Sequence, residues 1–283
     1  MKKHTKNKAR HSIPLRQPQF DFDSEIPRYW FGDNPVVTHN FNGYNLLFPE
    51  FERFFVRSVI YFKDQVKDEE LLEQIRGFAG QEINHAQAHQ AYFVVLERQG
   101  YKIKGLLKLY QRYARLLERM ASPKLRVALT AATEHYTSTI AGILVSHPEI
   151  LEGVHPTMKK LLIWHSAEEI EHRSVAFDVM QYMDIGYRTR IAAFLMASLD
   201  TLLWTGMSTL MLLWQDRISP WRILRYKFQH NNKFRHVNKQ MRRTLLMYFR
   251  KDFHPSHVDF LKEAHEQLNL VGIFVDKEEY IDE

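Results

Sequence analysis

Long stretches without glycine or proline are the feature that most constrains the fold of this chain. Its 283 residues include 11 Gly and 10 Pro. Between them, apolar residues recur at steps of three or four, as at Phe51, Phe55, Val59 and Phe62, which is the helical period. A fold of many short strands would need more tight turns than so few Gly and Pro provide. The sequence therefore predicts an all-α protein.

The expected helices follow a segment of irregular structure. Residues 17–48 are rich in Pro and Asn, with aromatic residues such as Trp30 to anchor them on the core. Pro49 suits the first turn of the first helix, and Asp68 is a natural N-cap for the second. Helices are expected from Pro49 to about 66, and over about 68–100, 104–120, 123–145, 156–183 and 191–214.

Positive charge is concentrated in two segments. The chain has a net charge of +6, yet residues 1–16 hold six basic residues and no acidic one, and residues 217–251 hold eleven and none. Residues 1–16 lack the apolar stretch of a secretory signal, so we expect a disordered tail on a cytoplasmic protein. Residues 17–260 are expected to form the helical domain and residues 261–283 an acidic C-terminal segment. Because the region between the two basic segments is slightly acidic, nucleic acid is not expected as a partner.

Residues 191–214 form an apolar stretch with a single charged residue, Asp200. The stretch is long enough to span a membrane. Ser and Thr recur along it at helical spacing, as in a helix packed against others, so a core helix, a homodimer interface and membrane contact stay open. Residues 217–251 could bind phosphates of nucleic acid or of anionic lipid, the latter giving peripheral membrane contact through 191–251. The alternative, which we favour, is a solvated basic face packed against the acidic C-terminal segment.

Three Glu-x-x-His patterns occur in the chain. Glu152 and His155 flank a glycine and precede Pro156, so we assign that pattern to a turn. The other two lie within expected helices, where residues three apart project from the same side and can hold one metal ion or two neighbouring ions.

These two patterns belong to a set that repeats along the chain. A single Glu on one helix is followed by a Glu-x-x-His on a later helix, and the order then recurs. The set is Glu52, Glu82, His85, Glu134, Glu169 and His172. Ferritin-like bundles with two metal ions use this arrangement, with one inward Glu from each of two helices and Glu-x-x-His from each of the others. The sequence therefore predicts a ferritin-like four-helix bundle with additional helices.

The setting of the glutamates favours metal binding. Glu134 lies in an otherwise nearly uncharged helix, where an unpaired carboxylate would be costly to bury. His165 lies one turn before Glu169; it is either a third imidazole ligand or a packed, supporting histidine. Four further residues are expected at the surface or in support of the ligands: His89, His135, Glu168 and Glu171.

The absence of Cys fixes the kind of metal site. Without thiolates, any metal must be held by His and carboxylate groups. Such ligands suit Fe best, with Mn or a mixed Mn/Fe pair next, and Zn if the protein is a hydrolase.

The motifs around these residues resemble the bacterial predicted metal-dependent hydrolases. The resemblance rests on FPEFERFFVR, QEINHAQAH, TEHYT and WHSAEEIEHRSVAFDV and extends over roughly residues 30–260. The ligand pattern is also similar to that of ferritin-like arylamine N-oxygenases, which have a His one turn before the last Glu-x-x-His, where His165 stands.

Three functions are compatible with this ligand set. The first hypothesis is an O₂-activating di-iron oxidoreductase, which would take a small organic or lipid-like substrate and an electron donor. The alternative is a hydrolase that uses a metal-bound hydroxide on an ester, amide or phosphoester. The third is a non-enzymatic metal-binding protein.

Overall fold

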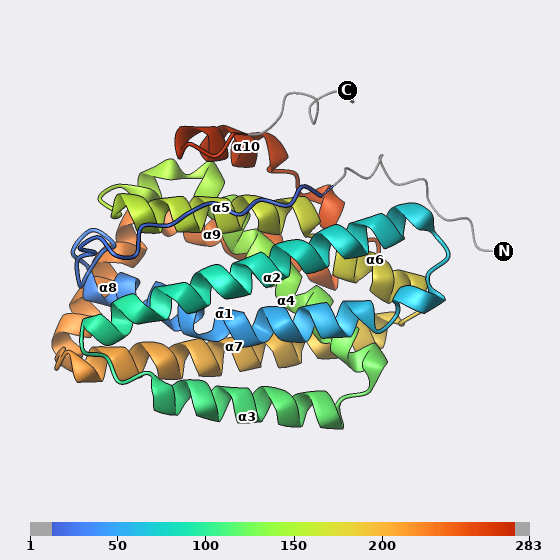
Figure 1. The fold of residues 1–283 in the computed structure, drawn as a ribbon, viewed down its shortest axis with the longest axis horizontal. Helices are drawn as coiled ribbons and strands as arrows, with labels where there is room; N and C mark the ends of the chain where they lie inside the picture. Colours follow the sequence, from blue (N-terminus) through green and yellow to red (C-terminus); the bar gives the residue numbers. More distant parts are fainter. Residues whose placement is uncertain (1–12, 275–283) are drawn as a thin grey trace.

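The structure is a computed structural model that describes residues 13–274 (Figure 1). Over these residues the chain is helical apart from an irregular segment before Pro35, short connections and one isolated bridge between Phe31 and Val154, so the all-α prediction is confirmed. The helices are α1 (Pro35–Ile60), α2 (Glu69–Arg98), α3 (Lys104–Met120), α4 (Pro123–Ser146), α5 (Pro156–His172), α6 (Val175–Tyr182), α7 (Tyr187–Gln215), α8 (Pro220–Lys233), α9 (Arg235–Leu246) and α10 (Leu261–Leu270).

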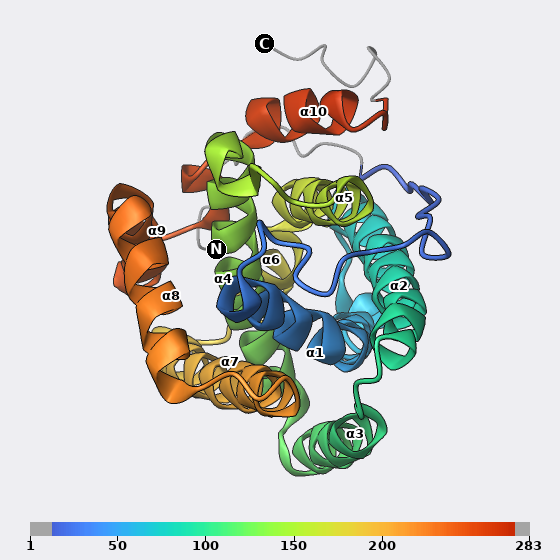
Figure 2. The same ribbon diagram turned by 90° about the vertical axis from the view of Figure 1, so that its left-hand side faces the viewer.

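Four helices pack around a common interior, as Figure 2 shows from one end. α1 contacts α2 and α4, and α5 contacts the same two helices. α7 lies against α1 and α4 on the outside of this group, α3 lies beside α1, and α10 lies beside α5. The four central helices are those on which the sequence places the metal ligands. Their ferritin-like relationship stays a prediction.

α1 begins earlier than predicted. The expectation of irregular structure holds for residues 17–34, but it is wrong for residues 35–48, because the helix starts at Pro35. The side-chain oxygen of Asn34 accepts hydrogen bonds from the N–H groups of the second and third helical residues at 3.0 and 3.2 Å, which is a stronger start signal than Pro49 alone. Pro49 lies buried inside the helix, at the cost of one backbone hydrogen bond.

The single helix predicted over 156–183 is divided at Arg173. Its guanidinium donates to the carbonyl of Ile170, which is the group that the N–H of Ser174 would reach in a continuous helix. The Arg173 side chain thus competes with the backbone N–H of Ser174 for this carbonyl where the helix breaks. α5 ends at His172, its last candidate ligand.

α7 contains the apolar stretch predicted at 191–214 and is long and apolar enough to cross a membrane by length and composition. One face is packed on α1 and α4 and buries Thr201, Thr205 and Ser208. Gly43 permits this contact, since a Cβ there would lie 3.0 Å from the hydroxyl of Thr209. Only 33% of the most apolar window of α7 is buried, so the rest of the helix faces outward.

The two ends of the chain are described in part. Residues 1–12 and 275–283 lie outside the described residues, and with them most of the tail predicted over 1–16 and part of the acidic segment predicted over 261–283. Residues 13–16 lie along α2, where Leu15 approaches within 2.5 Å of the position that a Cβ on Gly80 would take.

The basic segment 217–251 forms α8, α9 and a short 3₁₀ turn. α9 packs mainly on α4 and α8 on α1, whereas α10, the described part of the acidic segment, packs on α5 and α4. The main partners of the basic segment therefore differ from the predicted ones.

Candidate metal centre

All seven predicted ligands are buried, and the structure brings them together. They come from α1 (Glu52), α2 (Glu82 and His85), α4 (Glu134) and α5 (His165, Glu169 and His172), with exposed fractions of 0–7%. Two apolar clusters lie on either side: Trp164 of one contacts the ring of His85 at 4.8 Å, and Phe78 of the other contacts His172 at 5.0 Å. The cluster of Glu and His is thus a polar layer between two parts of the core.

One group of ligands gathers around His172. Its Nε2 atom lies 3.2 Å from Oε1 of Glu82 and 3.3 Å from Oε2 of Glu134. Oε1 of Glu169 is 3.6 Å from the same nitrogen. These are separations between atoms that can share one metal ion.

A second group gathers around His165. Its Nε2 atom lies 3.0 Å from Oε1 of Glu169 and 3.9 Å from Oε1 of Glu52. Nδ1 of His85 lies 3.9 Å from the same Glu169 oxygen. Glu169 therefore stands between the two groups, in the place of a carboxylate that could contact both of two metal ions.

Many atoms that point into this layer have no hydrogen-bond partner within the described part of the chain. They are both carboxylate oxygens of Glu52, Glu82 and Glu134, Nδ1 of His85 and Nε2 of His172. Leaving buried polar groups unsatisfied is costly and rare in native structures. Cations between these atoms would satisfy them, so the residues fit a metal centre.

The carboxylates also raise one another's pKa. Burial and then the charge of Glu82 raise the pKa of Glu52 well above its usual value, and burial and then Glu134 do the same for Glu82. Burial is the largest cause of the rise in the pKa of Glu134 from 4.5 to about 7. The layer therefore lacks the nearby positive charge that would keep these carboxyl groups ionised.

Contacts between histidines and glutamates act in the opposite direction on two residues. Burial would raise the pKa of Glu169, but the proximity of His165 and His172 outweighs burial and holds this pKa well below its usual value. Burial opposes a charged His172, yet the surrounding glutamates raise the pKa of its imidazole well above the ordinary value.

Hydrogen bonds at the back of each imidazole orient its free nitrogen. His85 Nε2–H donates to Glu168 at 3.0 Å, and Glu168 also accepts from the indole of Trp164 at 2.9 Å. His172 Nδ1–H donates to the side-chain oxygen of Gln81 at 2.8 Å. Such contacts fix the ring orientation and the tautomer of metal-binding histidines.

His165 is held by a longer series of hydrogen bonds. The side-chain amide of Asn45 donates to the carbonyl of Phe41 at 2.8 Å, so its oxygen faces His89, whose Nδ1–H it accepts at 2.7 Å. Nε2 of His89 is then left to accept from Nδ1–H of His165 at 2.7 Å. This leaves Nε2 of His165 directed at the carboxylates.

The structure corrects the surface option for four residues. His89, His135 and Glu168 are buried, and Glu171 is half-buried. Glu168 and His89 support ligands directly. Two supporting residues, Asn45 and Gln81, are absent from the sequence predictions; Gln81 adjoins the ligand Glu82, and His89 lies one turn after His85, and these were the available signals.

The remaining Glu and His patterns do not form a comparable site. Glu152 and His155 lie in the connection before α5, with a turn at Gly153, where φ is +73°. A group of His147, Glu149 and His236 also lies close enough to hold an ion. It is partly exposed, and exposed acidic groups are common without a metal.

A small cavity of about 50 Å³ reaches the candidate metal centre between α1, α4 and α5. It is bounded by the ligands His165 and Glu169 at one side. Its other walls are mostly apolar: Phe41, Tyr44, Phe48, Ile140, Ala141, Leu144 and Leu162, with Asn45, Thr137 and Ser166 as polar groups. The layer therefore borders a small cavity with mostly apolar walls.

Comparison with known proteins agrees with the site. A family described as predicted metal-dependent hydrolases matches residues 14–259. The chain belongs to this family. The match covers every candidate ligand and confirms the hydrolase resemblance seen in the sequence. No curated protein and no solved structure matches the chain, so the similarity to arylamine N-oxygenases stays a prediction. Membership in the predicted metal-dependent hydrolases agrees with a buried centre of His and Glu.

Proposed function

We propose that this protein is a metal-dependent hydrolase that cleaves an ester or amide with an apolar chain. The observation that carries the proposal is the set of unpaired, buried carboxylate and imidazole atoms on four helices, beside a cavity with apolar walls. Membership in the family favours hydrolysis over oxygen chemistry. Hydrolysis, the alternative in the sequence analysis, is therefore favoured over the first hypothesis of a di-iron oxidoreductase.

The ligands we propose are Glu52, Glu82, His85, Glu134, His165, Glu169 and His172, holding two metal ions. Metal ions held there would supply Lewis-acid polarisation and a water of lowered pKa. Side chains of the protein itself orient the proposed ligands and exclude water from them. Phe48 packs on the rings of His89 and His165, with ring centroids 4.7 Å away in both cases. Thr137 donates to Oε2 of Glu169, which turns the other oxygen, Oε1, toward the histidines.

The cavity defines the substrate class. Its apolar walls favour an acyl or alkyl chain, while Ser166 and Asn45 offer polar contacts near the reacting group. A charged phosphoester headgroup would be costly to bury among these side chains. We therefore place carboxylic esters and amides ahead of phosphoesters.

The experiment compares p-nitrophenyl esters of increasing acyl length on protein loaded with Zn, Mn or Fe. We expect hydrolysis that chelation abolishes and that readdition of one metal restores. Leu144→Trp should fill the cavity and reduce kcat/KM for longer esters about tenfold or more, whereas Leu203→Trp, outside this cavity, should not. Hydrolysis that is absent with every metal, or insensitive to chelation, would refute the proposal.

A di-iron oxidoreductase is the second candidate. Four glutamates with three histidines form an oxygen-rich ligand set that suits Fe or Mn, which is the observation in its favour. This function would need an electron donor. Reduced, iron-loaded protein that consumes O₂ stoichiometrically, together with no ester hydrolysis, would support it over hydrolysis.

A further inference from the structure

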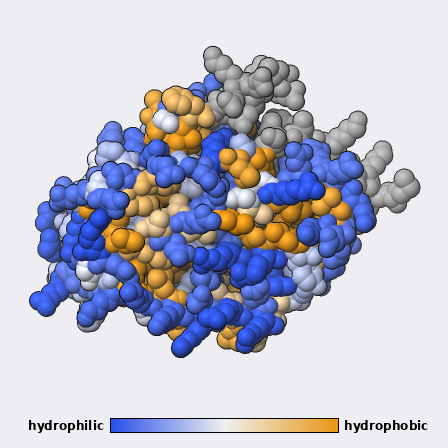
Figure 3. Space-filling model, viewed as in Figure 1, coloured by the Kyte–Doolittle hydropathy of each residue, from blue (hydrophilic) through white to orange (hydrophobic). Residues whose placement is uncertain are grey.

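The outward face of α7 is apolar and unpacked. Leu199, Leu202, Leu203, Leu210 and Trp214 are 58–79% exposed. Their spacing places them on the side of α7 away from the buried Thr residues. On the face of the molecule seen in Figure 3, apolar side chains likewise reach the surface in patches among hydrophilic ones.

α8 continues this surface as a helix exposed on most sides. Trp221, Leu224 and Phe228 are 57–80% exposed and follow the i, i+3, i+7 spacing of one helical stripe. Arg222 and Arg225 are also exposed. Apolar side chains with a large aromatic share, flanked by Arg, are typical of helices that lie in a membrane interface.

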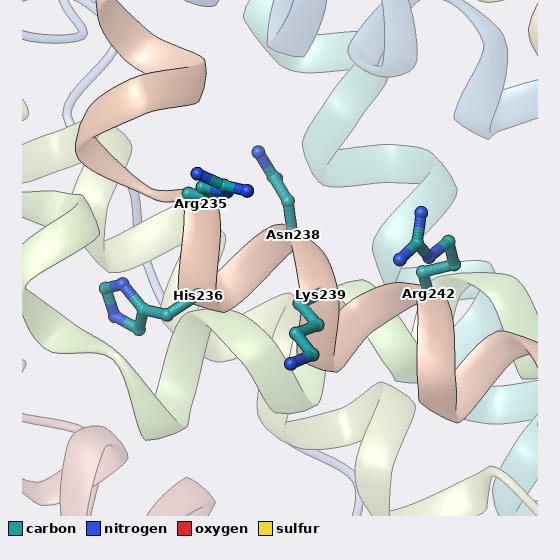
Figure 4. A pocket seen from close by; sticks show the side chains of 5 residues that line it. All are labelled: Arg235, His236, Asn238, Lys239 and Arg242. Carbon is teal, nitrogen blue, oxygen red and sulfur yellow. The ribbon is translucent and has the colours of Figure 1, made fainter.

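The neighbouring α9 adds further positive charge. In Figure 4 the side chains of Arg235, Lys239 and Arg242 project from one stretch of α9. The described region 217–251 contains eleven basic residues and no acidic one. Basic residues close to an anionic membrane surface are attracted to it.

A second cavity, of about 260 Å³, lies under the same face between α1, α3, α4 and α7. Leu199 and Leu203 are 58% and 60% exposed and also line this cavity, so it reaches the surface at the apolar face. Its interior is largely apolar, with a polar pair formed by Tyr113 donating to Asp200.

We propose that the outward face of α7 and the adjoining α8 dock on the surface of membranes containing anionic lipid, with α7 parallel to the membrane. In this arrangement α7 cannot cross the membrane by itself, because its inner face is packed on α1 and α4. A second copy of this chain is less suited than a membrane to cover this face, because a symmetric interface through α8 would bring like charges together. The proposal does not rest on the metal centre or on hydrolysis.

The test is cosedimentation of the full chain with vesicles of phosphatidylcholine alone or with added phosphatidylglycerol. We expect binding to the anionic vesicles at least about tenfold tighter than to the neutral ones, and weaker at high salt. The double variant Trp221→Ala/Phe228→Ala and the double variant Arg222→Glu/Arg225→Glu should each lose about tenfold or more.

The matched control is Ile83→Ala/Val94→Ala, which removes two exposed apolar side chains from α2 and should bind as the unmodified protein does. All substitutions are at exposed positions, and circular dichroism checks that the variants fold. Absence of binding to anionic vesicles, or equal binding by both docking variants and the unmodified protein, would overturn the proposal. So would a dimer that the same substitutions dissociate, in a protein that does not bind vesicles.

Discussion

Each histidine of the candidate metal centre has one ring nitrogen bonded to a supporting group and the other directed at glutamates. For His85 and His172 the supports are Glu168 and Gln81, and for His165 the support is His89. The candidate ligands, whose metal binding stays a prediction, could be selected from the sequence because Glu-x-x-His on a helix fixes a shared face. Their supports could not, since hydrogen bonds between helices depend on how the helices pack.

The support of His165 is open to direct test. Replacing His89 by Ala removes the acceptor of the His165 Nδ1–H group, so we expect metal affinity to fall roughly 10- to 100-fold. Isothermal titration with Zn or Mn measures this. His236→Ala is the matched control, since His236 lies on α9 outside the candidate metal centre and its replacement should leave the affinity of that centre unchanged. Equal affinity in the His89 variant would show that this series of hydrogen bonds does not matter.

Buried carboxylates that bind metal should destabilise the metal-free protein. Glu52→Gln removes one of several mutually repelling charges, so we expect the metal-free variant to be more stable to denaturant by about 1–3 kcal/mol. With metal present the order should reverse, because the variant has lost a ligand. Urea unfolding with chelator and with metal measures both states. A variant that is less stable in both states would argue that Glu52 has a purely structural role.

At the scale of the helices, the sequence predicts the central elements, but it misses the start of α1 and the break after α5, and it makes no prediction for α8, α9 and α10. Pro49 marks the predicted start of the first helix, yet the cap at Asn34 decides where α1 begins. The earlier start brings Asn45 onto α1, in contact with His89. The break after His172 has no Gly or Pro to mark it, because it involves the Arg173 side chain.

The contact of α1 with α7 depends on a residue without a side chain. Gly43→Leu would force carbon atoms into Thr205 and Thr209, so we expect a loss of about 1–3 kcal/mol. Gly206→Ala, in the interior of α7, meets nothing within 4 Å and should stabilise by about 1 kcal/mol through helix propensity. Thermal and urea unfolding compare the two. Similar effects of both substitutions would contradict the close packing of α1 on α7.

The end of α7 is held by an ionised carboxylate. Asp216 accepts hydrogen bonds from His39 and Tyr101 and pairs with Arg28 at 2.7 Å. Burial opposes ionisation, but these hydrogen bonds outweigh it and lower the pKa of Asp216 below 3.8. The contribution to stability is therefore complete above about pH 4 and is lost as the pH falls through the lower, folded-state pKa.

We expect Asp216→Asn to cost about 2 kcal/mol at pH 7, with a difference from the unmodified protein that shrinks as the pH falls below about 4. Urea unfolding over this range of pH measures the difference. A difference that stays constant down to pH 2 would show that the charge of Asp216 contributes little.

At the scale of the whole molecule, one group of helices carries two regions of different chemistry, one in the interior and one on the outside. The interior holds unpaired Glu and His atoms between two apolar clusters, and the outside carries the apolar face of α7 beside basic α8 and α9. Apolar periodicity and ligand spacing predict the first. The sequence alone leaves the second open, because an apolar helix has the same composition whether its outer face is covered or bare.

The metal content of the protein, purified without added metal and measured by elemental analysis, tests the central claim most directly. We predict about two first-row metal ions per chain, at most about one in Glu134→Gln and His172→Ala, and an unchanged content in Glu118→Gln, which alters a surface glutamate paired with Arg57. A protein that holds no stoichiometric metal even after incubation with Fe, Mn and Zn, or variants that keep the full content, would contradict the assignment of this buried cluster as a metal centre.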